Sequence, residues 1–269
     1  MNPIRIRFFL SSLLLIVAGC SPNSIQLVDL HIHLKGDLTL EEAMKKSEKE
    51  GIKYGIAINC GVGFPVQTDA QADSFLQVMQ QYPGFYVGMQ AEGREWVRLF
   101  SEETLAKFDY VFTDAMTFTD AKGRRNRIWI PEETWIDDEE AFMEYLVQTI
   151  ESILNHEPID IYVNPTYLPE ALAGRYNVLW TPERMDRVIE AARKNKVAIE
   201  INNRFKIPSA EFIRRAKKAG IRFTMGTNNV DKNFDGSGYT REMIKTCKLS
   251  KDDFWLPEKK NANTGSIVP

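Results

Sequence analysis

Two histidines separated by one residue are the side chains of this sequence best suited to chemistry. His31 and His33 lie near the N-terminus, and the 269-residue chain contains three histidines in all. Alternation along a β-strand places both on one face, with Asp29 in phase and with Leu30 and Ile32 facing the surrounding helices. Two neutral imidazoles at the end of a strand are a ready pair of ligands for a divalent metal ion. The alternative is a pair of histidines satisfied by backbone groups.

Seven strand-like runs alternate with helical stretches along the chain. Several runs are short, apolar and β-branched, which is typical of parallel strands buried on both faces. This alternation predicts an α/β fold with a parallel sheet or a (β/α) barrel, whose active site would lie at the C-terminal ends of the strands. The strands are expected at residues 26–33, 53–59, 85–91, 110–113, 160–163, 197–201 and 221–225.

Helical signals are clear between several of these strands. Thr39, with Glu42 three residues later, forms a capping box that begins a helix at 40–50. An i, i+3, i+4, i+7 stripe of apolar residues predicts another helix over 138–155. The segment 117–137 interrupts the alternation and is too long for an average connection, so we expect a lid or rim element there. Its basic and aromatic residues are Arg124, Arg125, Arg127, Trp129 and Trp135.

The N-terminal residues are typical of a lipoprotein signal. Arg5 and Arg7 precede an apolar run at 8–17 that is too short to span a bilayer comfortably. The Val-Ala-Gly-Cys ending at Cys20 resembles the lipobox of bacterial lipoproteins, in which this cysteine is acylated. We expect a lipid-anchored protein of the cell envelope, and of the outer membrane if the host is Gram-negative. The expected divisions are a signal peptide over 1–19, a lipidated tether over 20–26, a barrel over 27–258 and a flexible tail over 259–269.

Composition and charge narrow the classes of function. The contents of 43% hydrophobic and 26% charged residues argue against intrinsic disorder and against a multi-span membrane protein. The net charge is −3 and becomes −5 once Arg5 and Arg7 leave with the signal. A mildly acidic chain lacks the broad basic surface of nucleic-acid-binding proteins, so we expect no nucleic-acid partner.

At the chemically suited residues the chain resembles the PHP family, the polymerase-and-histidinol-phosphatase metal-dependent phosphoesterases. His31 and His33 resemble the opening His-x-His motif of that family, and Glu92, after Gly88, resembles the Glu of its Gly-x-Glu motif. Four later stretches also resemble family motifs, in the same order along the chain. Residues 108–113 resemble the stretch that leads to the family's Ser-x-His motif. Residues 164–165 resemble His-Pro, residues 199–202 resemble Leu-Glu-Ile-Asn, and residues 226–230 resemble Gly-Ser-Asp-x-His. The resemblance implies a distorted, seven-stranded (β/α) barrel of the TIM type with up to three metal ions.

The sequence departs from the family at several ligand positions. Ala115 stands at the histidine of Ser-x-His and Asn164 at the histidine of His-Pro. Asn228 and Val230 stand at the Asp and His of the last motif. Because Asn amides are weak ligands for transition metals, the resemblance implies one divalent ion (zinc, manganese or iron) rather than three. Its expected ligands are His31, His33 and Glu92.

The resemblance also supplies catalytic and substrate-binding candidates. The metal ion would lower the pKa of its bound water and polarise a phosphoryl or acyl oxygen. Asp114 is expected as a further ligand or as the general base, and Arg94 or Arg204 would hold an anionic substrate group. We therefore expect a metal-dependent hydrolase, of the phosphoesterase type, with a small anionic substrate. Further substrate contacts are expected from Lys35, Asn164, Asn202 and Asn228.

Two other interpretations stay open. The asparagines at former ligand positions keep their hydrogen-bonding capacity without metal affinity, which favours a catalytically inactive barrel that binds a ligand or partner at the cell surface. The wider amidohydrolase superfamily also opens with His-x-His on its first strand. That superfamily needs later histidine ligands, for which this sequence has no suitable residue.

Overall fold

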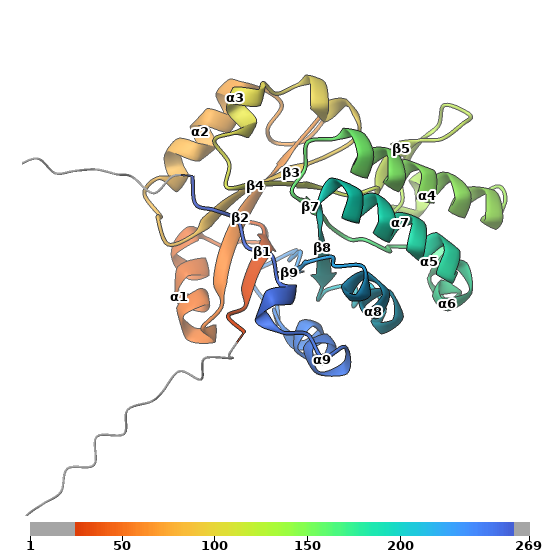
Figure 1. Ribbon diagram of the computed structural model, residues 1–269. Coiled ribbons are helices and arrows are strands. Elements are labelled where there is room, and N and C mark those ends of the chain that lie inside the picture. The colour runs from red at the N-terminus through yellow and green to blue at the C-terminus, as the bar shows by residue number, and fades with distance from the viewer. Residues whose placement is uncertain (1–24, 261–269) are drawn as a thin grey trace, which may run out of the picture.

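Seven parallel strands close into a barrel, with helices on its outside, in the computed structural model of the protein (Figure 1). The structure describes residues 25–260; the expected signal peptide and Cys20 lie outside this range. The predicted seven-stranded α/β barrel is confirmed. Around the barrel, the strands are β1 Val28–Ile32, β2 Lys53–Cys60, β3 Tyr86–Ala91, β4 Tyr110–Thr113, β7 Ile161–Tyr162, β8 Ala198–Asn202 and β9 Phe223–Gly226.

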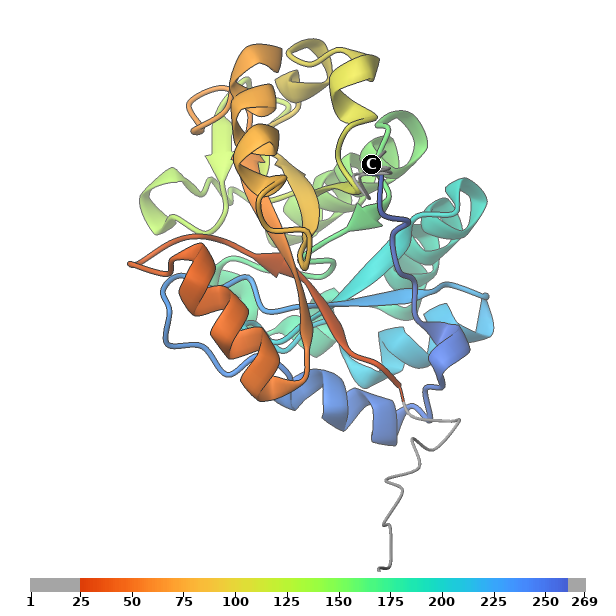
Figure 2. The same cartoon turned by 90° about the vertical axis from the view of Figure 1, so that its left-hand side faces the viewer.

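Helices follow most of the strands, as the periodicity predicts. The capping box of Thr39 and Glu42 begins α1, and Figure 2 shows this helix lying beside β1 and β2. The helices α2 and α9 were not predicted from the apolar pattern. The α-helices are α1 Leu40–Glu50, α2 Asp69–Met79, α3 Glu102–Leu105, α4 Glu139–His156, α5 Glu170–Ala173, α6 Tyr176–Leu179, α7 Pro182–Asn195, α8 Ala210–Lys218 and α9 Gly238–Thr246. Three 3-10 helices complete the described elements: η1 Glu95–Arg98, η2 Pro131–Glu133 and η3 Lys251–Asp253.

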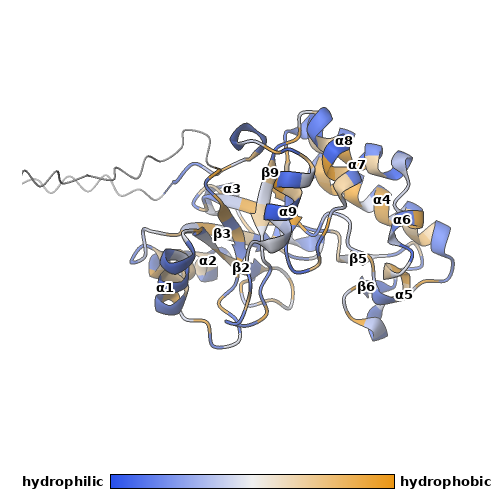
Figure 3. Ribbon diagram, turned by 90° about the horizontal axis from the view of Figure 1, so that it is seen from below, coloured by the Kyte–Doolittle hydropathy of each residue, from blue (hydrophilic) through white to orange (hydrophobic). Residues whose placement is uncertain are grey.

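Apolar side chains fill both the space between strands and helices and the lower part of the barrel interior. Figure 3 shows hydrophilic residues along α1, on the outside of the barrel. Inside, the Tyr110 ring lies against two glycines, and its hydroxyl donates to the Leu30 carbonyl at 2.7 Å. A Cβ atom at Gly55 or Gly88 would overlap this ring or its hydroxyl. The apolar side chains around Tyr110 therefore fill the barrel interior below the polar C-terminal ends of the strands.

Strand β1 carries an irregularity that changes the expected side-chain alternation. Its pairing with β2 shifts register between Asp29 and Ile32. The prediction for Leu30 was wrong, because this residue packs inside the barrel. Asp29 was also misplaced: its carboxylate accepts from two backbone N–H groups, those of Thr227 at 3.0 Å and of His31 at 3.1 Å, and not from an imidazole ring. A bulge-like irregularity inverts the phase of a strand, so alternation counted through it fails.

The segment 117–137 is an ordered element beside the barrel rather than a plain loop. Strands β5 Thr117–Thr119 and β6 Arg125–Arg127 pair as an antiparallel hairpin, and η2 follows. The hairpin packs on α4, where the Tyr145 hydroxyl donates to the Thr119 carbonyl at 2.7 Å. Trp129 of this segment lines the pocket described below, which agrees with a rim element.

The last described residues of the chain contact the barrel. Lys260, in the expected tail, donates from its backbone N–H to Asp109 at 2.7 Å, and the Lys259 ammonium lies 5.4 Å from the Tyr86 ring centre.

Between residues 25 and 260, no helix has the length and apolar character needed to cross a bilayer.

Candidate functional site

A pocket of about 350 Å³ opens at the C-terminal ends of the barrel strands, and we call it the barrel pocket. Active sites of (β/α) barrels gather at this end, because the loops that follow the strands converge there. Polar residues form much of its lining and aromatic residues much of its rim. The lining residues are Lys35, Asn59, Phe64, Pro65, Gln90, Glu92, Asp114, Met116, Trp129, Asn164, Tyr167, Arg204, Phe205 and Asn228.

His31 is fixed by a buried carboxylate from β8, the next strand but one around the barrel. Its Nδ1 lies 2.6 Å from Oε1 of Glu200 on β8, and both side chains are 1% exposed. A Cβ atom at position 226 would overlap that Oε1, so the pair requires Gly226. The carboxylate accepts from Nδ1–H and orients the ring so that Nε2 faces the barrel interior.

His33 has a similar arrangement, with a backbone carbonyl in place of the carboxylate. Its Nδ1 lies 3.0 Å from the Ala57 carbonyl oxygen, which can only accept, so Nδ1 carries the proton. Burial holds the pKa of His33 well below its usual value, so the ring is neutral. Its Nε2 therefore has a free lone pair, and this buried atom has no hydrogen-bond partner in the described part of the chain.

The neighbour of these rings on β3 is Gln90, not the expected Glu92. Gln90 Oε1 lies 3.3 Å from His31 Nε2, whereas Glu92 accepts from the Asn59 amide at 2.7 Å. In a Gly-x-Glu motif that begins at Gly88, the position of the glutamate is residue 90, which is Gln90 in this chain. The motif spacing therefore indicated that residue 90, and not Glu92, lies beside the histidines. Asn59 and Gln90 are also partners in the β2–β3 register, and the sequence analysis missed both.

The side chains of the described residues do not fit a metal centre of the expected kind. No three His, Cys, Asp or Glu side chains between residues 25 and 260 come together as metal ligands. The predicted set of His31, His33 and Glu92 is therefore not assembled, and the neutral Gln90 amide lies beside the rings in place of an anionic ligand. A glutamine oxygen is a weak ligand for zinc, iron or manganese and adds no negative charge.

Two asparagines, Asn164 and Asn228, meet at the floor of the barrel pocket. The Asn164 amide donates to Asp114 at 2.8 Å, and its oxygen accepts from Asn202 at 2.9 Å and from Asn228 at 3.2 Å. The Asn164 backbone N–H donates to Glu200 at 2.9 Å. Asn164 and Asn228 line the pocket as predicted, whereas Asn202 is fully buried beneath it. This network satisfies its polar groups without a cation.

Two carboxyl groups in the pocket have raised pKa values. Burial, followed by repulsion from Asp114, raises the pKa of Glu92 well above its usual range. Burial also raises the pKa of Asp114, although the Met116 N–H and the Asn164 amide donate to its carboxylate. Burial and mutual repulsion disfavour ionisation of both acids, so the pocket carries less negative charge than its residues suggest.

Of the three predicted cations, two line the barrel pocket and one does not. Lys35 and Arg204 lie in its lining, and the Arg204 guanidinium stands 4.8 Å from the Phe205 ring centre. Arg94 points elsewhere: its guanidinium donates to Glu157 at 2.8 Å and to the Asp114 carbonyl at 2.9 Å. Arg94 lines a second pocket outside the barrel, so the structure gives it no contact with a substrate in the barrel pocket.

The fold is similar to that of a histidinol phosphatase. No protein-family model matches the chain, and the search of curated proteins gives no match either. A histidinol phosphate phosphatase from Lactococcus lactis, crystallised with zinc, L-histidinol and phosphate, superposes with a TM-score of 0.60 at 14% identity. The match covers 84% of this chain and 95% of that one. An HpcH/HpaI aldolase from Desulfitobacterium hafniense gives a TM-score of 0.40 at 13% identity, over 83% and 93% of the two chains. The first likeness supports the PHP-like barrel.

Proposed function

We propose that the barrel pocket binds a small molecule with an anionic group, and that it does so without a resident metal ion. One observation carries the proposal: Lys35 and Arg204 line the same pocket, and neither forms an ion pair with a carboxylate in the described part of the chain. A guanidinium and an ammonium group at one site suit a phosphate or a carboxylate, because they supply several donors and two positive charges.

The rest of the lining agrees with a ligand of this kind. The raised pKa values of Glu92 and Asp114 favour their neutral forms, so these acids cancel less of the positive charge. Aromatic side chains at the rim, among them Tyr167 and Phe205 with ring centres 4.7 Å apart, limit the ligand to small molecules. The pocket thus combines a polar floor, two cations that form no ion pair in the described part of the chain, and an apolar rim, as small-molecule sites commonly do.

Calorimetric titration with inorganic phosphate and with succinate tests this proposal. We expect at least one of them to bind, and Arg204→Gln and Lys35→Gln each to weaken binding about tenfold. Lys45→Gln, on exposed α1, is the matched control and should bind as the unaltered chain does. Binding that is absent, or that both pocket variants leave unchanged, would contradict the proposal.

Hydrolysis with one divalent ion is the second candidate. A specific observation favours it: the Nε2 lone pair of His33 has no partner, and Nε2 of the neighbouring His31 contacts only the Gln90 amide. Zinc, manganese or iron at these two rings, with Asp114 nearby as a base, would suit a phosphoesterase. Metal analysis after loading with zinc or manganese distinguishes the candidates, with p-nitrophenyl phosphate as the substrate probe. Stoichiometric metal that is lost in His33→Ala, together with turnover, would establish the hydrolase.

Attachment to the cell envelope through Cys20 remains part of the proposal and rests on the sequence. The chain enters β1 at the N-terminal end of the barrel, so an anchor there would leave the barrel pocket facing away from the membrane. Mass spectrometry of the membrane fraction should find an acylated cysteine at the mature N-terminus. Cys20→Ser should release the protein from that fraction, and unchanged fractionation would contradict the anchor.

A further inference from the structure

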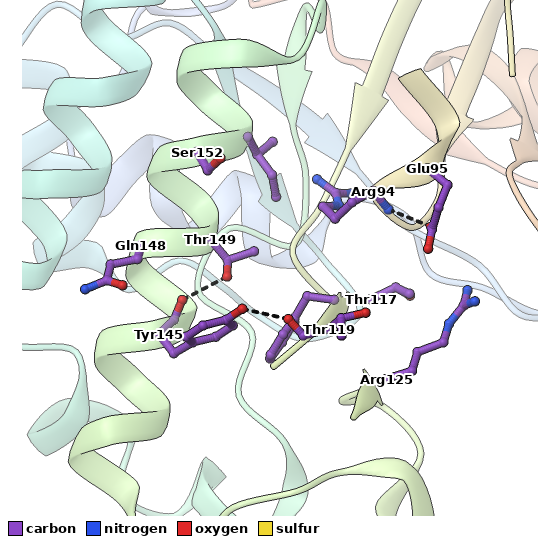
Figure 4. Close-up of a pocket in the computed structure, with 11 residues that line it drawn as sticks. Arg94, Glu95, Thr117, Thr119, Arg125, Tyr145, Gln148, Thr149 and Ser152 are labelled. Atoms are coloured by element: carbon purple, nitrogen blue, oxygen red, sulfur yellow. Dashed lines mark hydrogen bonds between the residues drawn. The ribbon is translucent and has the colours of Figure 1, made fainter. Parts of the chain in front are cut away.

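A second pocket, which the proposed function does not use, lies outside the barrel between the β5–β6 hairpin and α4. We call it the hairpin pocket; its volume is about 370 Å³. Figure 4 shows α4 residues on one side, the hairpin threonines in the middle, and Arg94 with Glu95 opposite. The polar groups that matter here belong to Arg94, Thr117, Thr119, Arg125, Gln148 and Ser152.

Two polar atoms of this lining are buried without a partner. Within residues 25–260, three buried side-chain nitrogen or oxygen atoms lack a hydrogen bond, and Arg94 Nε and Thr117 Oγ1 are two of them. Thr117 is only 2% exposed, so bulk water does not replace the missing bond. Because an unpaired buried donor or acceptor is costly, folded proteins rarely keep one without a reason. A ligand with several oxygen atoms in the hairpin pocket would supply partners for these atoms.

The charges around the pocket favour a neutral ligand. The Arg94 guanidinium already pairs with Glu157 at 2.8 Å, and its other Nη donates to Thr113 and to the Asp114 carbonyl, so Nε is its one nitrogen without a hydrogen bond in the described part of the chain. The lining holds one further cation, Arg125, and one carboxylate, Glu95. Positive and negative charges therefore balance, unlike in the barrel pocket, and an anion gains little here.

The remaining lining suits a molecule with many hydroxyl groups. Hydroxyls and one amide, from Thr119, Gln148 and Ser152, both donate and accept hydrogen bonds. Phe118 and Tyr145 supply apolar surface, with ring centres 5.8 Å apart. Alternating polar contacts and apolar ring faces match the hydroxyl groups and C–H faces of a sugar ring. We propose that the hairpin pocket binds a neutral polyhydroxylated molecule of monosaccharide size, which accepts from Arg94 Nε–H and hydrogen-bonds the Thr117 hydroxyl.

The test uses the purified chain with D-glucose, D-galactose, N-acetyl-D-glucosamine and myo-inositol as probes in saturation-transfer NMR and calorimetry. We expect saturable binding of at least one probe and a loss of about tenfold or more in Thr117→Val and in Gln148→Ala. Thr117→Val keeps the shape of the side chain and removes a hydroxyl without a partner, so its melting temperature should not fall. Lys35→Gln, in the barrel pocket, should bind the sugar normally.

Three outcomes would overturn the proposal. Absence of saturable binding of all four probes by the folded protein would mean that only water occupies the pocket. Binding that persists in Thr117→Val would place the sugar elsewhere. Binding of inorganic phosphate that is lost in Arg125→Gln, with none of the neutral probes bound, would show that the ligand class is wrong. None of these results depends on the ligand of the barrel pocket, so the two proposals stand or fall separately.

Discussion

The barrel pocket and the hairpin pocket lie on either side of the chain segment that follows β4, and their polar groups are satisfied in different ways. On the barrel side, Asp114 and Asn164 belong to a network in which carboxylates and amides bond to one another. Three residues further on, Thr117 lines the hairpin pocket with a hydroxyl that has no partner. The network of the barrel floor thus stabilises the empty protein, whereas two polar atoms of the hairpin pocket have no partner in the described part of the chain.

Removal of the carboxylate at the centre of the barrel network should have the largest effect. Glu200→Ala leaves the His31 ring, the Asn164 N–H and the Asn202 amide without their shared acceptor. Loss of a buried charged partner costs about 3–5 kcal/mol, which we expect from urea denaturation. Glu200→Gln keeps the shape and should cost less. A cost below about 1 kcal/mol for the alanine variant would show that the network does not stabilise the barrel.

Truncation of the asparagine that connects the network should come next in size. Asn164→Ala removes the donor to Asp114 and the acceptor for Asn202 and Asn228, so buried groups lose partners. We expect a decrease of about 2–3 kcal/mol in the free energy of unfolding, measured by denaturant titration. An exposed asparagine gives the control, since Asn155→Ala on α4 should change stability by less than about 0.5 kcal/mol. Equal effects of both variants would contradict the comparison.

The acids of the barrel pocket predict a dependence of stability on pH. Because burial raises the pKa of Glu92 from its ordinary 4.5 to about 8 in the folded state, protonation favours folding. This contribution to stability is fully present below the ordinary value and is lost as the pH rises through the raised pKa, with a total loss of about 1 kcal/mol or more. Glu92→Gln should therefore flatten the decline in stability between about pH 4.5 and pH 8, followed by urea denaturation from about pH 4 to pH 9. An unchanged decline in this variant would show that Glu92 ionises normally.

Two threonines close to each other should give the smallest and most direct contrast. The Thr113 hydroxyl donates to the Ala91 carbonyl at 2.6 Å, and the Thr117 hydroxyl has no partner. Thr113→Val should lower the free energy of unfolding by about 1–3 kcal/mol, whereas Thr117→Val should leave it unchanged or raise it. Parallel thermal and urea unfolding of both variants checks this. A similar loss in both would mean that Thr117 has an unseen partner in the empty protein.

Local signals in the sequence predicted most of the barrel. Apolar, β-branched runs place the seven strands to within a few residues, and the capping box of Thr39 and Glu42 gives the start of α1. The sequence did not reveal α9, which begins without a side-chain cap, or the β5–β6 hairpin, whose strands have three residues each. Such short or uncapped elements depend on tertiary packing more than on local propensity.

The site was predicted in part. Lys35, Arg204, Asn164, Asn228, Glu92 and Asp114 line one pocket as expected, because the C-terminal ends of parallel strands converge. The sequence analysis missed Gln90 and placed Arg94 in the wrong pocket. Both errors concern the direction in which a side chain points at the end of β3, which depends on the strand register and on hydrogen bonds to distant residues.

Short-range signals are enough to specify the parallel barrel, because strand composition, helical periodicity and caps act over a few residues and agree with one another. Which side chains meet depends instead on the complete fold. The register shift in β1 turned Leu30 inward together with His31, and the β2–β3 register brought Asn59 beside Gln90. Contacts between residues far apart in the chain depend on the accumulated register of every strand between them. A motif such as His-x-His therefore gives two possible ligands, and the rest of the barrel decides whether a third joins them.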